Sequence, residues 1–413
     1  MRRIPILIAT FALLTSPTSA QEQEPYQFPL GLGPNCNHNV HGNDQAIPAN
    51  QPYRFMWQKF VKLNRMARIQ WEVVLANGQT ASTNNAVWET FAEDGFTFPS
   101  DPDPANPPQW EDRIEYLKRQ DRAQPVRALH VASAGDSSDP QPIELVYRNR
   151  AAFDYIIDNG LWYTQGIAAF FKSGQEVEFP TDAIEVKGNY IPITEDQKPQ
   201  YHWNYINGEL YGLVASHVIT KDLPNWTWAT FEQWSNAGRC DFLGCRDCFG
   251  QTPVFTPSHT DKVGQTYPAE TQTARLLDLY RKAGYEGAYF EAYKQYRIKG
   301  VMIDFADSTG NPNFLGNSVT EDGFVQTASC MSCHARAAVT PDGKNAFPIF
   351  GEFQGWPLSQ TTPSQFGITF ITPFGYPDRN WYTTFNGNGS QRLFLQTDFV
   401  WAIPFKAQPA KNP

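Results

Sequence analysis

LVASHVI, residues 213–219, is a short run of mostly apolar and β-branched side chains, and it predicts a buried β-strand. Upstream of it, over residues 143–211, short apolar runs alternate with turn signals. Among these signals, Asn207-Gly208 is typical of the two-residue turn of a β-hairpin. A short helix is expected among the strands at residues 151–158. The region therefore predicts a mixed α+β fold.

Two longer helices are expected on either side of this region. Apolar residues at mostly helical spacing run over residues 53–75 and end at Asn77-Gly78, a pair typical of a helix C-cap. A second helix is expected over residues 271–282, because Gly284 is placed to stop it. Proline interrupts the stretch 99–108 so often that it predicts an exposed loop.

The composition predicts an acidic, loop-rich globular protein. The chain has 413 residues, of which 41% are hydrophobic and 14% aromatic, enough for one large core or two ordinary ones. The 33 Lys and Arg residues against 42 Asp and Glu residues give a formal net charge of −9. Because nucleic-acid binding depends on positive charge, we expect no nucleic-acid partner. The 29 Gly and 32 Pro residues predict many turns and long loops.

The N-terminus is typical of a secretory signal peptide. Arg2 and Arg3 precede an apolar run over residues 4–14, and Thr18-Ser19-Ala20 is a small-residue cleavage site before Gln21. A membrane anchor would need about 20 apolar residues, and this run is half as long. We therefore expect export to the periplasm with cleavage, and no transmembrane anchor in the mature chain.

Residues Cys330-Met331-Ser332-Cys333-His334 carry the strongest chemical signal, a C-x-x-C-H sequence. In this pattern two thiols add to the vinyl groups of haem, and the histidine coordinates the iron. The two intervening residues bring both sulfurs to neighbouring edges of one porphyrin ring. The motif occurs once, so the sequence predicts one covalently attached haem c, held by Cys330, Cys333 and His334.

Two other interpretations of the motif remain open from the sequence. A C-x-x-C redox dithiol would need a thioredoxin-like βαβ setting, whereas this motif lies in a loop-rich stretch. Half of a zinc site would need two further ligands at matched spacing. Export favours haem c over both, because haem is attached outside the cytoplasm.

The sixth iron ligand is not identified by the motif. His334 is the last histidine and Met331 the last methionine, so a side-chain ligand of these types has to come from upstream. The remaining alternatives are water, a substrate, Lys or Tyr. The upstream candidates are His38, His41, His130, His202, His217, His259, Met56, Met66 and Met302. His217 is the first choice, because a histidine in a buried strand needs a partner for its ring nitrogens, and Met302 is a weaker candidate.

Four further cysteines, Cys36, Cys240, Cys245 and Cys248, are expected to form two disulfides in an oxidising compartment, with the pairing open. The alternative is a zinc site in which Cys36, His38 or His41 completes the Cys240, Cys245 and Cys248 set.

The chain also resembles a group of large monohaem cytochrome c proteins that proteobacteria export. The resemblance covers most of the mature chain and implies haem attachment and export, without a substrate. It lies in residues 55–64, 88–90, 149–156, 179–180, 184–187, 213–218, Lys221, 226–232, 330–335 and 397–401.

Together these observations predict a loop-rich α+β fold with a C-terminal cytochrome c-like haem-binding region. We expect a signal peptide at 1–20, an α+β part at 21–300 and the haem-attachment region at 301–413, in one continuous domain or two. The expected function is that of a periplasmic c-type cytochrome that transfers electrons to a partner protein. The alternative is a haem-dependent oxidoreductase in which a small-molecule substrate or peroxide meets an open iron site. The length favours this alternative, because one haem needs only about 100 residues around it.

Overall fold

The structure is a computed structural model. It describes residues 47–120, 126–127, 142–252, 264–307, 310, 312–322, 324–347, 361–363, 369–371, 377, 379–386 and 389–411. The signal peptide and the zinc candidates Cys36, His38 and His41 lie outside these residues, as do the ligand candidates His130 and His259.

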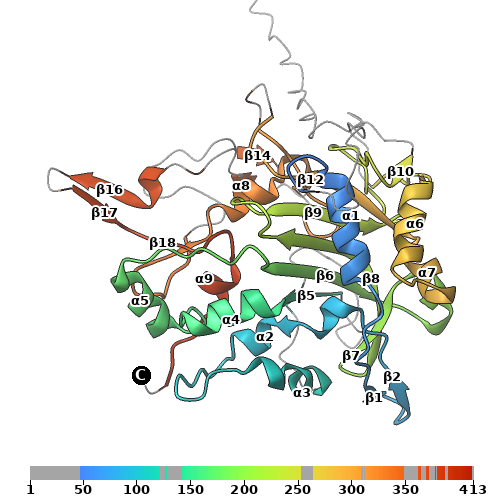
Figure 1. Ribbon diagram of the computed structural model, residues 1–413, viewed down its shortest axis with the longest axis horizontal. Helices are drawn as coiled ribbons and strands as arrows, with labels where there is room; N and C mark the ends of the chain where they lie inside the picture. The colour runs from blue at the N-terminus through green and yellow to red at the C-terminus, as the bar shows by residue number, and fades with distance from the viewer. Residues whose placement is uncertain are drawn as a thin grey trace, which may run out of the picture.

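An antiparallel sheet of eight strands organises the fold (Figure 1). The strand predicted over residues 213–219 lies within β8, near the middle of the sheet, and is confirmed. The sheet follows the order β12 (Tyr296–Met302), β9 (Thr227–Gln233), β8 (Glu209–Thr220), β6 (Ile184–Pro192), β5 (Ile143–Arg148) and β3 (Ala92–Glu93), with β4 (Val126–Arg127) on β5 and β7 (Trp203–Ile206) on β8. The α+β class predicted from the sequence is therefore confirmed.

The hairpin predicted at Asn207-Gly208 joins β7 to β8, with Ile206 opposite Glu209. Asn207 has φ 52° and Gly208 has φ 84°. A two-residue turn of this kind needs positive φ at both positions, because only then does its twist match that of the strands.

The two faces of the sheet have different chemistry. Val218 of β8 pairs with Ala229 of β9 and faces one core, in which Phe60 of α1 (Pro52–Leu63) stacks on Phe231 at 4.1 Å. His217, one residue earlier, points to the opposite face because strand side chains alternate. The sheet thus separates an apolar face under α1 from a face that carries His217.

The remaining helices and strands cover both faces and the sheet edges. On the α1 side lie α6 (Ala274–Lys282) and α7 (Gly287–Tyr293). The others are α2 (Asp94–Thr97), α3 (Arg113–Lys118), α4 (Arg150–Asp158), α5 (Thr164–Ser173), α8 (Cys330–His334), α9 (Ala402–Lys406), and the strand pairs β1 (Glu72–Val74) with β2 (Thr80–Ser82), β10 (Gln251–Thr252) with β11 (Thr271–Gln272), β13 (Ala338–Val339) with β18 (Leu395–Gln396), β14 (Thr361–Pro363) with β15 (Thr369–Ile371), and β16 (Thr383–Asn386) with β17 (Gly389–Arg392). Short 3₁₀ helices occupy Val87–Thr90, Trp110–Asp112, Glu195–Gln200, Val325–Thr327 and Arg379–Trp381.

Two of the predicted helices are confirmed, and the third is too long. The helix at 151–158 is α4, and the helix at 271–282 is α6, which begins after its N-cap Thr273. Gly284 has φ 82°, as expected of a residue that ends a helix. The stretch 99–108 contains neither helix nor strand, as predicted.

The helix predicted over 53–75 is wrong beyond Leu63. Asn64 ends α1, because its Nδ2 donates to the Phe60 carbonyl at 2.9 Å and its Oδ1 accepts from Trp88 Nε1 at 2.8 Å. Residues 72–82 then form the β1–β2 hairpin, and Asn77-Gly78 belongs to its turn instead of a helix cap.

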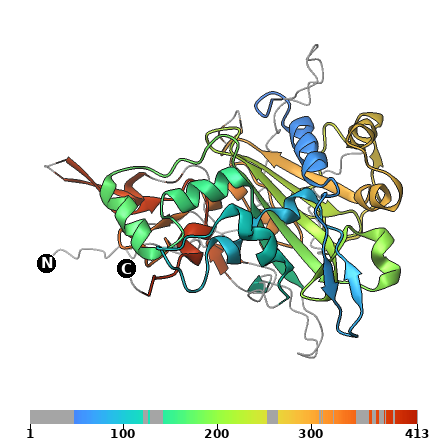
Figure 2. The same cartoon turned by 60° about the horizontal axis from the view of Figure 1, so that its bottom comes forward.

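A second core joins the C-terminal elements to the sheet. It contains Ile219 and Trp228 from the sheet, Met331 from α8 and Ile403 from α9. Figure 2 shows α4 and α5 beside these C-terminal elements. Strand β12 spans residue 300, the position expected to divide the α+β part from the haem-attachment region. None of the helices in the described part of the chain combines the length and apolarity needed to cross a bilayer.

The β7–β8 hairpin gives a test of the fold. A Cβ atom at Gly208 would lie 2.7 Å from the Val74 carbonyl oxygen, whereas a Cβ at Gly78, which also has positive φ, meets nothing within 4 Å. Gly208→Ala should therefore lower the free energy of unfolding by about 2–4 kcal/mol, and the control Gly78→Ala by about 1 kcal/mol. Urea unfolding measures both, and equal losses would contradict the close approach of Val74.

Candidate functional site

Helix α8 consists of the C-x-x-C-H residues themselves. Ser329 caps it, because its hydroxyl accepts a hydrogen bond from Ser332 N. Cys330 and Cys333 are three residues apart, so they lie on one side of the helix. Both are free thiols, and Cys330 Sγ donates to the Leu315 carbonyl at 3.2 Å. The helix thus presents two unpaired sulfurs together.

The acidity of the two thiols argues against a redox dithiol. Burial raises the pKa of Cys333 to about 11 and raises the pKa of Cys330 well above its ordinary value. Redox C-x-x-C pairs depend on a thiol whose pKa is lowered, because the thiolate is the reactive form. The environment of α8 does the opposite and keeps both sulfurs protonated.

The ring of His334 is fixed by one strong contact. Its Nδ1 lies 2.8 Å from the main-chain carbonyl oxygen of Phe399. Because a carbonyl oxygen only accepts, Nδ1 carries the proton, and Nε2 keeps its lone pair. Burial lowers the pKa of His334 to about 3, and the positive charge of Lys187 acts in the same direction. His334 is therefore a neutral imidazole with Nε2 available as a ligand atom.

Two tryptophans from distant segments hold the motif. The ring of Trp228 in β9 lies 4.6 Å from the ring of His334, centroid to centroid. Trp401 Nε1 donates to the Cys333 carbonyl at 3.2 Å. The motif helix is therefore anchored to the sheet on one side and to the C-terminal segment on the other.

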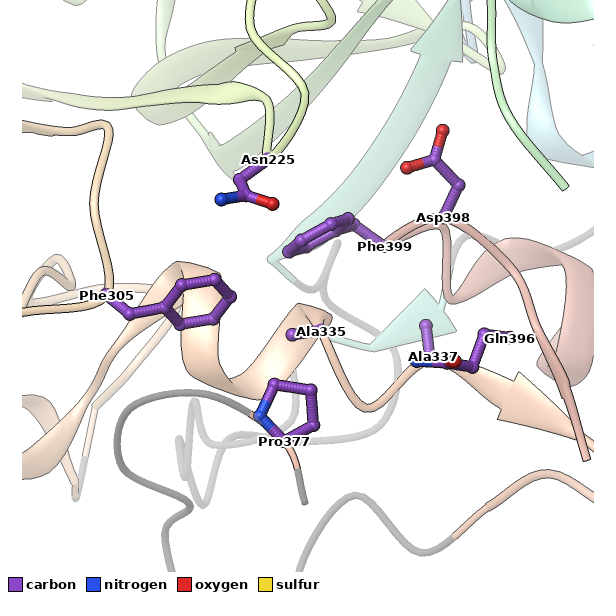
Figure 3. A pocket seen from close by; sticks show the side chains of 8 residues that line it. All are labelled: Asn225, Phe305, Ala335, Ala337, Pro377, Gln396, Asp398 and Phe399. Carbon is purple, nitrogen blue, oxygen red and sulfur yellow. The ribbon is translucent and has the colours of Figure 1, made fainter. Parts of the chain in front are cut away.

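A cavity of about 270 Å³ lies beside α8 (Figure 3). Across it, Phe305 and Phe399 face each other with ring centroids 6.3 Å apart. The lining residues are Asn225, Phe305, Ala335, Ala337, Pro377, Gln396, Asp398 and Phe399. The cavity adjoins the motif through Ala335, the residue after His334, and its lining mixes apolar with polar side chains.

The structure brings His217 to the same face of the sheet as α8. Its Nε2 lies 2.7 Å from Asn317 Nδ2 and 3.6 Å from Glu321 Oε2. Asn317 Nδ2 also donates to Thr230 Oγ1 at 2.9 Å. The predicted need of His217 for a partner is thus met by Asn317 within the protein.

Segment 317–321, which carries Asn317, is bound to the sheet by further polar contacts. Ser318 donates to Glu232 through both its hydroxyl and its amide, and Thr320 Oγ1 donates to Asn189 Oδ1 at 2.8 Å. Burial alone would raise the pKa of Glu321, but His217 lowers it. The carboxylate of Glu321 is therefore ionised beside the imidazole.

Met302 also lies near the motif. It ends β12 opposite Trp228, and its sulfur is 3.9 Å from the hydroxyl of Ser329, the cap of α8. The other described candidates are placed differently. Met56 is in α1 on the opposite face of the sheet, Met66 is exposed, and His202 Nε2 contacts Glu89 at 2.8 Å.

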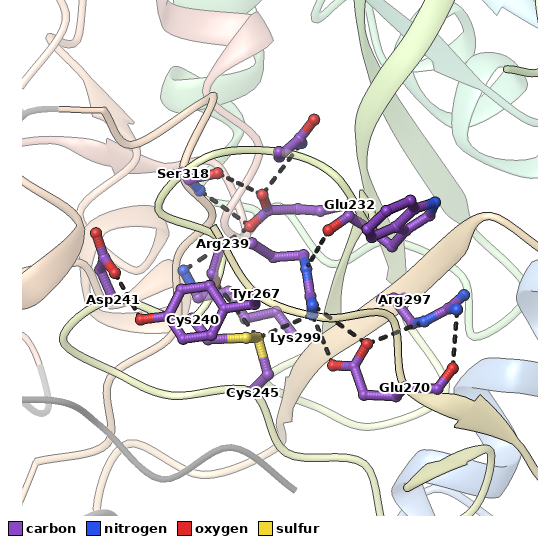
Figure 4. The surroundings of a disulfide bond; sticks show 12 residues. Glu232, Arg239, Cys240, Asp241, Cys245, Tyr267, Glu270, Arg297, Lys299 and Ser318 are labelled. Atoms are coloured by element: carbon purple, nitrogen blue, oxygen red, sulfur yellow. Dashed lines mark hydrogen bonds and ion pairs between the residues drawn. A yellow bond between two sulfur atoms is a disulfide. The ribbon is translucent and has the colours of Figure 1, made fainter. Parts of the chain in front are cut away.

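The second cysteine group contains a disulfide between Cys240 and Cys245 (Figure 4). Cys248 is also disulfide-bonded. Glu270 lies close enough to Cys240 and Cys245 to form a three-residue cluster, but its carboxylate binds Arg239 at 2.8 Å and Arg297 at 3.0 Å. The structure therefore supports a disulfide in this group and not the alternative zinc site.

The sequence analysis missed the partners that position the motif. The Phe399 carbonyl is a main-chain group, so no residue type marks it. Trp228 and Asn317 are ordinary core and turn residues until the fold places them beside His334 and His217. A partial signal existed, because Trp228 and Phe399 both lie in segments, 226–232 and 397–401, on which the expected resemblance rests.

Comparisons with known proteins add nothing to this picture. No family model, curated protein or solved structure matches the chain. The chemistry of the site is therefore derived from its own residues.

The contacts of Asn317 with His217 and Thr230 give a second test of the structure. Asn317→Ala removes the partner of His217 and the donor to Thr230, so it should lower the free energy of unfolding by about 2–4 kcal/mol. The side chain of Asn313, four residues earlier in the chain, donates to the Asp304 carbonyl at the surface, and Asn313→Ala should cost less than about 0.5 kcal/mol. Similar losses from the two variants would show that Asn317 has no special role.

Proposed function

We propose that the protein is an exported c-type cytochrome, with one haem attached at Cys330, Cys333 and His334, and that it transfers electrons in the periplasm. The observation that carries the proposal is the hydrogen bond from His334 Nδ1 to the Phe399 carbonyl, next to two free thiols. It leaves Nε2, the atom that ligates iron, as the only nitrogen of this ring with an available lone pair.

The two thiols and the imidazole of the motif are the groups that haem c attachment requires. Each thiol would add its sulfur and its proton across one vinyl double bond, so the attachment has no leaving group. His334 would provide the proximal ligand, and the Phe399 carbonyl fixes its ring and raises its basicity. When bound, haem c supplies a one-electron couple between ferrous and ferric iron.

The C-terminal part is proposed as a cytochrome c-like haem region. Its support is the way in which separate segments of the family resemblance meet at α8. Trp228 comes from the segment 226–232, His217 from 213–218, and Phe399 and Trp401 from 397–401. These residues lie around the motif although they are far apart in the sequence.

A second candidate function is a haem-dependent oxidoreductase with an open iron position. It is favoured by one observation, the engagement of His217 Nε2 by Asn317 at 2.7 Å and by Glu321 at 3.6 Å. A histidine engaged in this way is not free to ligate iron, which would leave the sixth position open to a small substrate.

Covalent attachment is tested by intact mass and a pyridine haemochrome spectrum of the exported protein. The wild type should carry the mass of one haem and the spectrum of two thioethers. Cys330→Ala and Cys333→Ala should each leave a single thioether and weaken retention, whereas the control Ser332→Ala keeps the spacing and should retain the haem. A colourless wild type with the mass of its amino acids alone would refute the proposal.

The two candidate functions differ in the spin state of the iron. An electron carrier should give a low-spin ferric spectrum that cyanide and peroxide leave unchanged, because a sixth ligand is in place. A high-spin spectrum that responds to them favours the oxidoreductase. If the iron is low-spin, His217→Ala and Met302→Leu identify the ligand, since only its loss produces a high-spin fraction.

A further inference from the structure

The carbonyl that holds His334 belongs to an unusual turn. Asp398 has φ 47° and Phe399 has φ 70°, so two consecutive residues other than glycine adopt the left-handed conformation. Side chains disfavour this region, and a bulky residue such as Phe is a clear outlier there. Such backbone persists only where the surroundings enforce it, and it clusters at functional sites.

The side chain of Asp398 is what enforces the turn. Its Oδ1 accepts from Lys221 Nζ at 2.7 Å and from Trp226 Nε1 at 3.2 Å, and its Oδ2 accepts from the Phe179 amide at 2.8 Å. The side chains of Lys221 and Asp398 are only 6% and 8% exposed, so water does not compete with this pair. The carboxylate is thus held from three directions.

Two of the partners of Asp398 come from the loop that joins β8 to β9. Lys221 directly follows β8, and its Nζ also donates to the Pro224 carbonyl at 2.8 Å. Trp226 directly precedes β9 and itself has φ 60°, a third left-handed residue in this cluster. The loop between two central strands therefore fixes the turn that faces the motif helix.

We infer that Lys221, Trp226 and Asp398 form a clamp of positioning residues that aims the Phe399 carbonyl at His334 Nδ1 and so sets the reduction potential of the iron. The inference rests on the proposed function, because it concerns the proximal ligand of the haem. The hydrogen bonds of these three residues do not involve the imidazole of His334, although Asp398 also lines the cavity beside α8. They act through the turn at residues 398–399.

The direction of the effect follows from the hydrogen bond. An imidazole that donates Nδ1–H to a well-placed carbonyl is a stronger electron donor at Nε2. A stronger donor favours the ferric state and lowers the potential. Loosening the clamp should weaken the bond and make the midpoint potential more positive.

Charge alone would give a different pattern, and this makes the test sharp. Asp398→Asn removes a negative charge, which by itself also raises the potential. Lys221→Gln removes a positive charge, which by itself lowers it. The clamp predicts a more positive potential in both variants, because both release the turn.

Trp226→Phe is the milder variant, chosen in case loss of one buried charge prevents folding. It removes one hydrogen bond to Asp398 and no charge, and it should shift the potential in the same direction by a smaller amount. The matched control is Glu270→Gln, which neutralises a similarly buried carboxylate beside Arg239 and Arg297, at the opposite end of β12 from Met302. Glu270→Gln should lower the stability of the protein without a comparable shift of the reduction potential.

The experiment is a spectroelectrochemical titration of the haem-loaded, exported proteins, together with the rate at which the His334 Nδ1 proton exchanges with solvent. A positive shift and faster exchange in Lys221→Gln and Trp226→Phe support the clamp. A negative shift in Lys221→Gln with no change in Trp226→Phe overturns it, because charge then explains everything. A wild-type protein without haem refutes the proposed function. If the wild type carries haem and the folded variants have the same reduction potential as the wild type, only the clamp is refuted.

Discussion

The hydrogen bond between His334 Nδ1 and the Phe399 carbonyl connects the motif helix α8 to the turn at residues 398–399. It decides which ring nitrogen carries the proton, and therefore which one is available to a metal. It also joins two chain segments 65 residues apart. Its acceptor lies in a strained turn, so the bond exists only because buried contacts from the sheet hold that turn in place. The chemistry proposed at the motif thus depends on residues that never touch it.

This dependence explains why a five-residue motif sits in so large a protein. Helix α8 is a single short turn, and an isolated helix of that length does not form in water. Its cap contacts Met302 of β12, its histidine packs against Trp228 of β9, and its last cysteine carbonyl accepts from Trp401. The other face of the sheet packs against α1. The sheet therefore supports α8 from one side while its own other face is covered.

What the sequence predicted well was local. The Asn207-Gly208 turn, the strand at 213–219 and the helix α4 follow from neighbouring residues alone. The helix expected over 53–75 failed because Asn64 is satisfied by Trp88, a contact between separate segments. The same limit applied at the site, where the sequence predicted the motif but could not predict the contact with the Phe399 carbonyl. A main-chain acceptor in a left-handed turn depends on tertiary contacts and has no residue signature.

The two candidate sixth ligands differ in what ligation would cost the protein. If His217 turned its Nε2 to a metal, Asn317 would lose one of its two acceptors, and the ionised Glu321 would lose its buried partner. Each such loss costs about 1–3 kcal/mol. The sulfur of Met302, a residue buried in the second core, makes a weak polar contact at 3.9 Å with the Ser329 hydroxyl, so ligation would cost it no strong hydrogen bond. His217 is therefore less suited, as it stands, to bind the iron than Met302.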